Sequence, residues 1–127
     1  MRTMTMVIAG IAALLIVGGG LVWYENRPLG VPSAEQFKNL NGFAFVLATV
    51  DSLACPYDTL TQKKFDVAKA KVSRLRARYT LTPAQTEKLA HTVTIGGYYG
   101  TGLRRKEVCD KFGSRLADFL NRRIDSQ

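Results

Sequence analysis

The two cysteines, Cys55 and Cys109, have the most readily assigned chemistry in this sequence. They form no C-x-x-C pair, so a redox pair is not indicated, and a single reactive cysteine is the alternative to a disulfide. A disulfide between them would close a loop of roughly 54 residues and stabilise a small domain by about 4 kcal/mol in the chain-entropy model. Because paired cysteines in small domains are typical of oxidising compartments, we expect a Cys55–Cys109 disulfide outside the cytoplasm.

Other candidates for catalysis or metal binding are few. His91 is the only histidine, which excludes a histidine-rich metal site. The carboxylates of Glu87, Glu107 and Asp110 form no recognisable glycosidase motif, and Glu107 lies among several arginines and lysines. Such cations would keep Glu107 ionised, which is the wrong state for a general acid. We therefore predict no enzyme, no cofactor and no metal; a cell-wall glycan hydrolase is the minor enzymatic alternative.

A glycine-rich segment at residues 96–102 contains the adjacent tyrosines Tyr98 and Tyr99. It lacks the Gly-Lys-Ser/Thr ending of a phosphate-binding loop. Because glycines permit tight turns, we expect a short connection between two helices with the tyrosines packed at its base. The alternative is a loop that presents the tyrosine pair to a protein partner.

The strongest surface signal is positive charge, since the chain carries a formal net charge of +8. A basic segment with Asp66 as its only acid would attract anionic lipid headgroups, an envelope polymer or an acidic protein, with a solvated helix face as the plain structural alternative. Phe65 and Tyr79 fall on the apolar side of this segment rather than among its cations, so nucleic acid is only a minor alternative partner. The candidate anion contacts are Lys63, Lys64, Lys69, Lys71, Arg74, Arg76 and Arg78.

Four helices are predicted to position these residues. The first begins at Ser33, which stands three residues before Gln36 in a capping-box spacing, and it ends near Cys55 and Pro56. Residues 43–50 are apolar on every side, so a buried strand is the alternative there. Length and the cap favour a helix.

The other three helices are indicated by apolar residues at intervals of three and four. The second should start between Thr59 and Thr61 and reach about Tyr79; the third starts at Thr82 and ends or bends at Gly96 and Gly97. The fourth should begin within residues 101–104 and continue through Gly113. A small all-α bundle of three to four helices follows, because each apolar stripe needs another to cover it. In chain order, the expected apolar positions are Phe37, Leu40, Ala44, Leu47, Val50, Phe65, Ala68, Val72, Leu75, Tyr79, Leu89, Val93, Cys109, Phe112, Leu116, Phe119 and Leu120.

An uncharged apolar run covers residues 4–24 and ends with Trp23 and Tyr24. About 20 apolar residues suffice to cross a bilayer as a helix, and Trp and Tyr favour the membrane interface. A cleavable signal peptide is the alternative, but Leu21 and Val22 continue the apolar stretch beyond the small residues at 18–20, which favours a retained anchor. The predicted organisation is a signal-anchor helix at 1–24, a connector at 25–32 and one helical domain at 33–127.

This organisation predicts a single-pass protein of the bacterial inner membrane with its carboxy-terminal domain in the periplasm. We expect a non-enzymatic interaction protein, an accessory or assembly subunit of a larger inner-membrane complex; a periplasmic chaperone-like protein and a phage lysis-control module are the alternatives. The domain is similar to acid-stress periplasmic chaperones in being small and helical with one disulfide, but it is strongly basic and anchored. The glycine-rich span resembles that of phage signal-anchor-release lysis proteins, although no lysozyme motif follows. Neither resemblance identifies a family.

Overall fold

The computed structural model describes residues 27–127, apart from the side chains of residues 105, 106, 110 and 112. Within this range lie four helices: α2 (Ala34–Leu53), α3 (Thr59–Arg78), α4 (Pro83–Gly102) and α5 (Arg105–Asp125). The predicted all-α bundle is confirmed. The expected membrane span at residues 4–24, including Trp23 and Tyr24, lies outside the described residues. Over residues 27–127, no helix combines the length and the apolarity that crossing a membrane requires.

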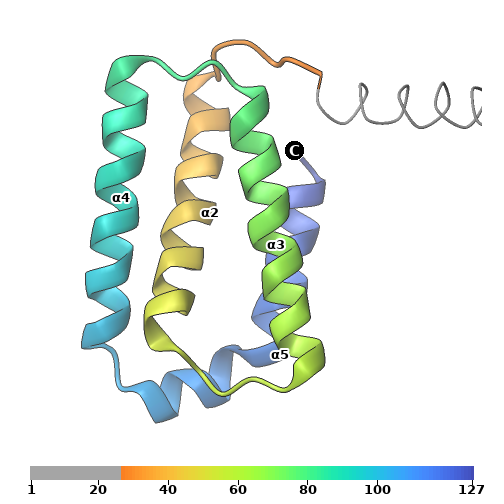
Figure 1. Cartoon of the computed structure of the whole chain (residues 1–127), viewed down its shortest axis with the longest axis vertical. Helices are drawn as coiled ribbons and strands as arrows, with labels where there is room; N and C mark the ends of the chain where they lie inside the picture. Colours follow the sequence, from red (N-terminus) through yellow and green to blue (C-terminus); the bar gives the residue numbers. More distant parts are fainter. Residues whose placement is uncertain (1–26) are drawn as a thin grey trace, which may run out of the picture.

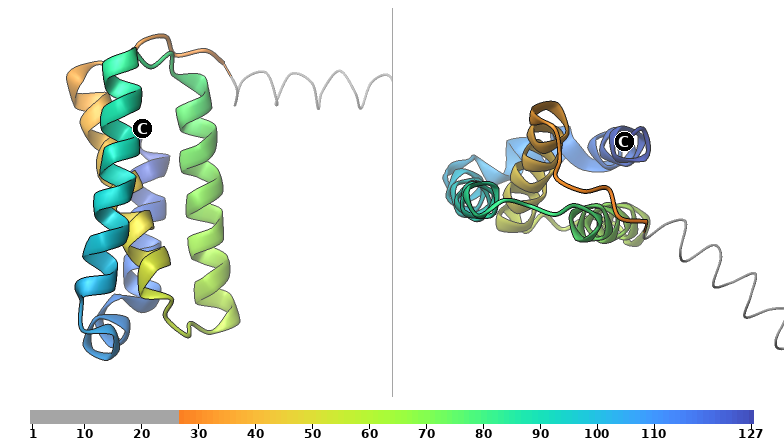
Figure 2. Two further views of the ribbon diagram at one scale, coloured as in Figure 1. Left: turned by 60° about the vertical axis from the view of Figure 1, so that its left-hand side comes forward. Right: turned by 90° about the horizontal axis from the view of Figure 1, so that it is seen from above.

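Helix α2 is the central element of the bundle. Consecutive helices run in opposite directions, so α2 and α4 start at the end of the bundle where residue 27 lies (Figure 1). Helix α4 packs along one side of α2, while α3 and α5 pack together on the other (Figure 2). Among the largest side chains, Leu40, Phe65 and Leu89 are fully buried, and they come from α2, α3 and α4. The core therefore joins α3 and α4 through α2, while α5 is attached mainly through α3.

The first two helices follow the sequence prediction closely. At the start of α2, the Ser33 hydroxyl accepts a hydrogen bond from the Gln36 backbone N–H, and the Gln36 side chain accepts one from the Ser33 N–H. Residues 43–50 are helical, so the strand alternative is wrong there. Helix α3 begins after Asp58, whose carboxylate accepts the Thr61 N–H at 2.7 Å, and its predicted apolar stripe is buried throughout.

The connector pairs with the end of α3. The Leu29 N–H donates to the Arg78 carbonyl at 2.8 Å, and the Thr80 N–H donates to the Gly30 carbonyl at 2.8 Å. Gly30 has a φ of 72°, a left-handed conformation that glycine adopts without steric cost. The segment after residue 27 is therefore fixed to the domain by backbone hydrogen bonds.

Helix α4 continues past Gly96 and Gly97 to Gly102, so the predicted end or bend at residues 96–97 is wrong. Gly96 and Gly100 are buried against α2. A Cβ atom at Gly96 would lie 2.8 Å from the Phe45 carbonyl oxygen, and one at Gly100 would lie 2.5 Å from the Thr49 carbonyl oxygen. The Thr49 hydroxyl, in turn, lies 3.2 Å from the Gly96 carbonyl oxygen, to which it donates. These glycines permit close approach of two helices rather than a turn.

Helix α5 departs from the prediction at Gly113, where the backbone is non-helical (φ −50°, ψ −123°) and the helix kinks. The part before Gly113 crosses under the bundle and the part after it runs back along α3 (Figure 1). After the kink the buried residues are Ala117, Leu120 and Ile124, while Phe119 is 53% exposed rather than part of the core. The predicted core position Val93 of α4 is 43% exposed as well.

Candidate interaction surfaces

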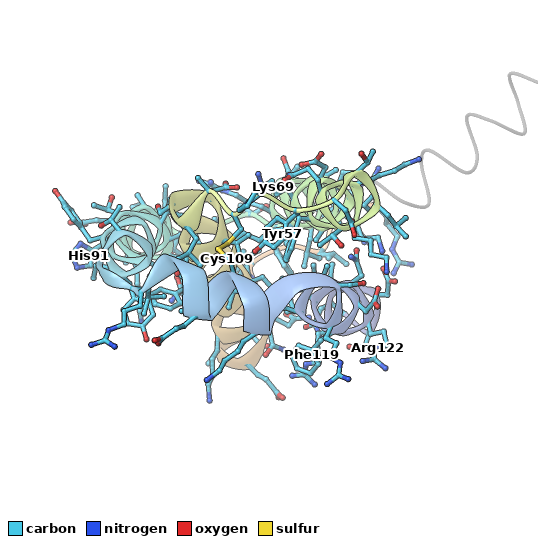
Figure 3. All side chains as sticks on the ribbon, turned by 90° about the horizontal axis from the view of Figure 1, so that it is seen from below. Tyr57, Lys69, His91, Cys109, Phe119 and Arg122 are labelled. Carbon is cyan, nitrogen blue, oxygen red and sulfur yellow. A yellow bond between two sulfur atoms is a disulfide. The ribbon has the colours of Figure 1, made fainter. Side chains whose placement is uncertain are left out.

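The predicted disulfide between Cys55 and Cys109 is present, with Cα atoms 5.6 Å apart. Cys55 follows directly after α2, where Ala54 takes a left-handed conformation, and Cys109 lies in the part of α5 before the kink (Figure 3). The bond therefore fixes the crossing segment of α5 beneath the end of α2. Next to it, the Tyr57 ring packs on Phe65 with centroids 4.9 Å apart, and burial raises the pKa of the Tyr57 phenol. These groups form part of the core.

The basic residues of α3 divide into two groups. Three of them form ion pairs with acids of neighbouring helices: Lys64 with Asp118 at 3.0 Å, Lys71 with Asp125 at 2.9 Å, and Lys69 with Asp51. These partners were not predicted because they lie 18 to 54 residues away in the chain. Such exposed pairs typically contribute at most about 1 kcal/mol each.

The remaining cations of α3 are more open to ligands. The Arg78 Nε donates a hydrogen bond to the Arg27 carbonyl oxygen at 3.0 Å. The other N–H groups of the Arg78 guanidinium remain able to donate to an anion. Lys63, Arg74 and Arg76 are exposed, and we find no ion pair or hydrogen bond for their side chains among residues 27–127. Anion binding by the seven predicted residues stays a prediction, with these four as the available groups.

Tyr98 and Tyr99 lie in the last turns of α4, not in a loop, so the predicted connection with tyrosines packed at its base is wrong. Tyr98 is 76% exposed and Tyr99 54% exposed. The Tyr99 ring lies 5.6 Å from the Phe45 ring of α2, centroid to centroid, which holds it in place. Ile95, 46% exposed, stands three and four residues before them and so shares their side of the helix. We call Ile95, Tyr98 and Tyr99 the tyrosine surface.

The backbone beneath the tyrosine surface is held closely against α2. Gly96 and Gly100 lie next to these residues in the sequence and face α2. Atoms of α2 leave no room for a side chain at either position. Ile95 was not predicted as part of this surface because the helix was expected to end or bend at Gly96 and Gly97. The i, i+3, i+4 spacing of Ile95, Tyr98 and Tyr99 would have indicated a shared helix face if the helix had been extended.

The candidate catalytic residues are not brought together. His91 is exposed on the outer side of α4 (Figure 3). Glu87 lies near the start of α4 and Glu107 follows its end, so they are separated by roughly 20 Å along the helix axis. Paired glycosidase carboxylates are roughly 5 to 9.5 Å apart. Glu107 instead lies 3.7 Å from Arg104, and the Asp110 side chain lies outside the described part.

Comparison of the chain with protein-family models, with curated proteins and with solved structures finds no match.

Proposed function

We propose that this protein is a membrane-anchored, non-enzymatic interaction protein: an accessory or assembly subunit of an inner-membrane complex, with its helical domain in the periplasm. The apolar run at residues 4–24 supports the anchor, and the Cys55–Cys109 disulfide supports an oxidising compartment. The observation that carries the proposal is the tyrosine surface. Exposed tyrosines on a fixed helix are the kind of residue that dominates protein–protein interfaces.

The position of the tyrosine surface suits contact with a partner away from the anchor. Residue 27 lies at the end of the bundle where α4 begins, and Tyr98 lies 15 residues further along α4, about 22 Å along its axis. Helix α4 also packs mainly on α2, so its outer side is not covered by α3 or α5 (Figure 2). The tyrosine surface therefore lies far along the bundle from the point where the chain would leave the membrane, on a helix whose outer side is not covered by α3 or α5.

The test is purification of the full chain from native membranes in mild detergent, with stoichiometry measured for co-purifying proteins. We expect a defined partner in fixed ratio, lost in the Tyr98→Ala/Tyr99→Ala variant. Phe119→Ala is the matched control, because Phe119 is an exposed aromatic residue of similar exposure on α5. As the hot spot of the interface, the tyrosine pair should cost about 2 kcal/mol or more of binding free energy when it is truncated, roughly a 30-fold loss of affinity.

Three outcomes would contradict the proposal. A protein isolated alone argues against a subunit. A scatter of unrelated clients, bound equally by the tyrosine variant, favours the chaperone-like alternative. Loss of the partner in Phe119→Ala but not in the tyrosine variant would move the contact to α5.

A further inference from the structure

A groove of about 490 Å³ opens between the connector and the ends of α3 and α5. Leu29, Leu75 and Ile124 form its apolar part, and Leu75 and Ile124 belong to the buried core. Arg27, Arg74 and Arg78 line it together with Lys71. An apolar base with cations beside it is suited to an anionic amphiphile rather than to a fully polar anion.

The groove has a net positive charge even without Arg27. Its other cations are Lys71, Arg74 and Arg78, and the one carboxylate that residues 27–127 contribute to it, Asp125, is paired with Lys71. The negative ends of the α3 and α5 dipoles, about half a charge each, reduce the excess but do not cancel it. Arg74 and Arg78 bring guanidinium groups, whose planar fork matches a phosphate group with two parallel hydrogen bonds.

The groove also lies where the chain would leave a membrane. The backbone hydrogen bonds of Leu29 and Gly30 to the end of α3 fix the connector at the groove. Three peptide units separate Arg27 from Tyr24, the end of the apolar run, and they reach at most about 10 Å. The headgroup layer is about 5 to 7 Å thick on each side of the hydrocarbon. A span that ends at Tyr24 would therefore keep Arg27, and the groove that it lines, within reach of the lipid phosphates.

The net positive charge of the whole domain is concentrated at the same end of the bundle as the groove. The ranges 27–41, 71–88 and 120–127, which form the end of the bundle near residue 27, contain nine Lys or Arg and three Asp or Glu. This end therefore holds six of the eight net positive charges of the chain. Its attraction for an anionic surface extends over about one Debye length, roughly 8 to 10 Å.

We propose that the groove binds the phosphate of an anionic phospholipid. Arg74 and Arg78 bind the phosphate oxygens, and Leu29, Leu75 and Ile124 contact the glycerol and the first acyl carbons. The proposal rests on the membrane anchoring proposed above. Binding would hold the bundle upright on the bilayer, with the tyrosine surface directed away from it.

The experiment uses the full chain carrying Thr80→Cys, an exposed position beside the groove, labelled with a fluorophore while the native cysteines stay bonded. The protein is reconstituted in vesicles of phosphatidylcholine, with or without phosphatidylglycerol, that contain a nitroxide-headgroup quencher lipid. We expect stronger quenching with phosphatidylglycerol. Arg74→Gln should lower the ratio of docked to undocked domain about fivefold. Lys63→Gln is the matched control: it removes the same charge from an exposed position of α3 distant from the groove, and it should change the ratio little.

The outcomes separate this proposal from the anchoring on which it rests. A chain removed from vesicles by alkaline wash overturns the anchor, and the lipid groove with it. A chain that stays inserted but is quenched equally in both lipids overturns the groove alone, as does an equal effect of Arg74→Gln and Lys63→Gln. Inorganic phosphate should compete with the lipid for Arg74 and Arg78 and weaken docking at an ionic strength where chloride does not; a lack of this competition would also overturn the lipid assignment.

Discussion

The contact between α4 and α2 makes a sharp prediction about single glycines. Gly100 faces α2, where an added Cβ atom would lie 2.5 Å from the Thr49 carbonyl oxygen and 2.8 Å from the Ser52 Cβ. The nearest atom belongs to the backbone, so no rotation of a side chain can relieve the overlap. We expect Gly100→Ala to push α4 away from α2.

The magnitude follows from two opposing effects. Overpacking of this kind costs about 1 to 3 kcal/mol, and a backbone clash belongs in the upper part of that range. Alanine is a better helix former than glycine by up to about 1 kcal/mol, which offsets part of the cost. The net loss should be about 1 to 2 kcal/mol of unfolding free energy. Each kcal/mol shifts Tm by about 4 to 8 °C in a domain of this size.

Gly42→Ala is the matched control because Gly42 is also inside a helix, α2, but has open space where the Cβ would lie. Only the propensity gain acts there, so this variant should be more stable than the parent by about 0.5 to 1 kcal/mol. The assay is urea and thermal unfolding of the oxidised full chain in mild detergent, followed by far-UV circular dichroism. The same substitution thus has opposite signs at two positions. If Gly100→Ala were as stabilising as Gly42→Ala, the close contact between α4 and α2 would be refuted.

Three further predictions concern the core, the disulfide and a helix cap. Replacing both Cys55 and Cys109 by alanine should cost about 4 kcal/mol through the larger entropy of the unfolded chain, measured as a lower urea midpoint; an unchanged midpoint would contradict this. Phe65→Ala, at a fully buried position, should cost about 3 to 5 kcal/mol, whereas Leu60→Ala, exposed on the same helix, should stay within about 0.5 kcal/mol of the parent in the same assay. Hydrogen bonds from the first turn of α3 hold the pKa of Asp58 below its usual value of 3.8. The stabilisation by this cap is therefore complete above pH 3.8 and is lost as the pH falls through the lower pKa of the folded state; Asp58→Asn should flatten this part of the stability–pH curve, and an unaltered curve would exclude the effect.

Local signals predicted much of the fold. The capping spacings at Ser33 and Thr82 placed the starts of α2 and α4, and the apolar stripe from Phe65 to Leu75 placed the buried face of α3. These features depend on residues three or four positions apart, which a sequence displays directly. The cap of α3 by Asp58 was not predicted, although the start of that helix was.

The predictions that were wrong concern features that depend on contacts between residues far apart in the sequence. Gly96 and Gly97 have low helix propensity, but α2 offers small residues and carbonyl groups against which a helix with glycines packs closely. Gly113 permits the kink that lets α5 turn after its disulfide-fixed first part. Periodicity also cannot locate the edge of a buried stripe, which is why Phe119 was assigned to the core.

The sequence by itself determined the helical class, three of the helix starts, the two cysteines available for bonding, the net positive charge and the apolar run at residues 4–24. Tertiary structure decided which cations pair with acids, which glycines are buried, and that the tyrosines lie on an exposed helix face. It also placed the connector against the ends of α3 and α5, which creates the cationic groove. The physical reason is that propensity, caps and periodicity act within one or two helical turns, whereas ion pairs, close helix contacts and grooves depend on which helices become neighbours.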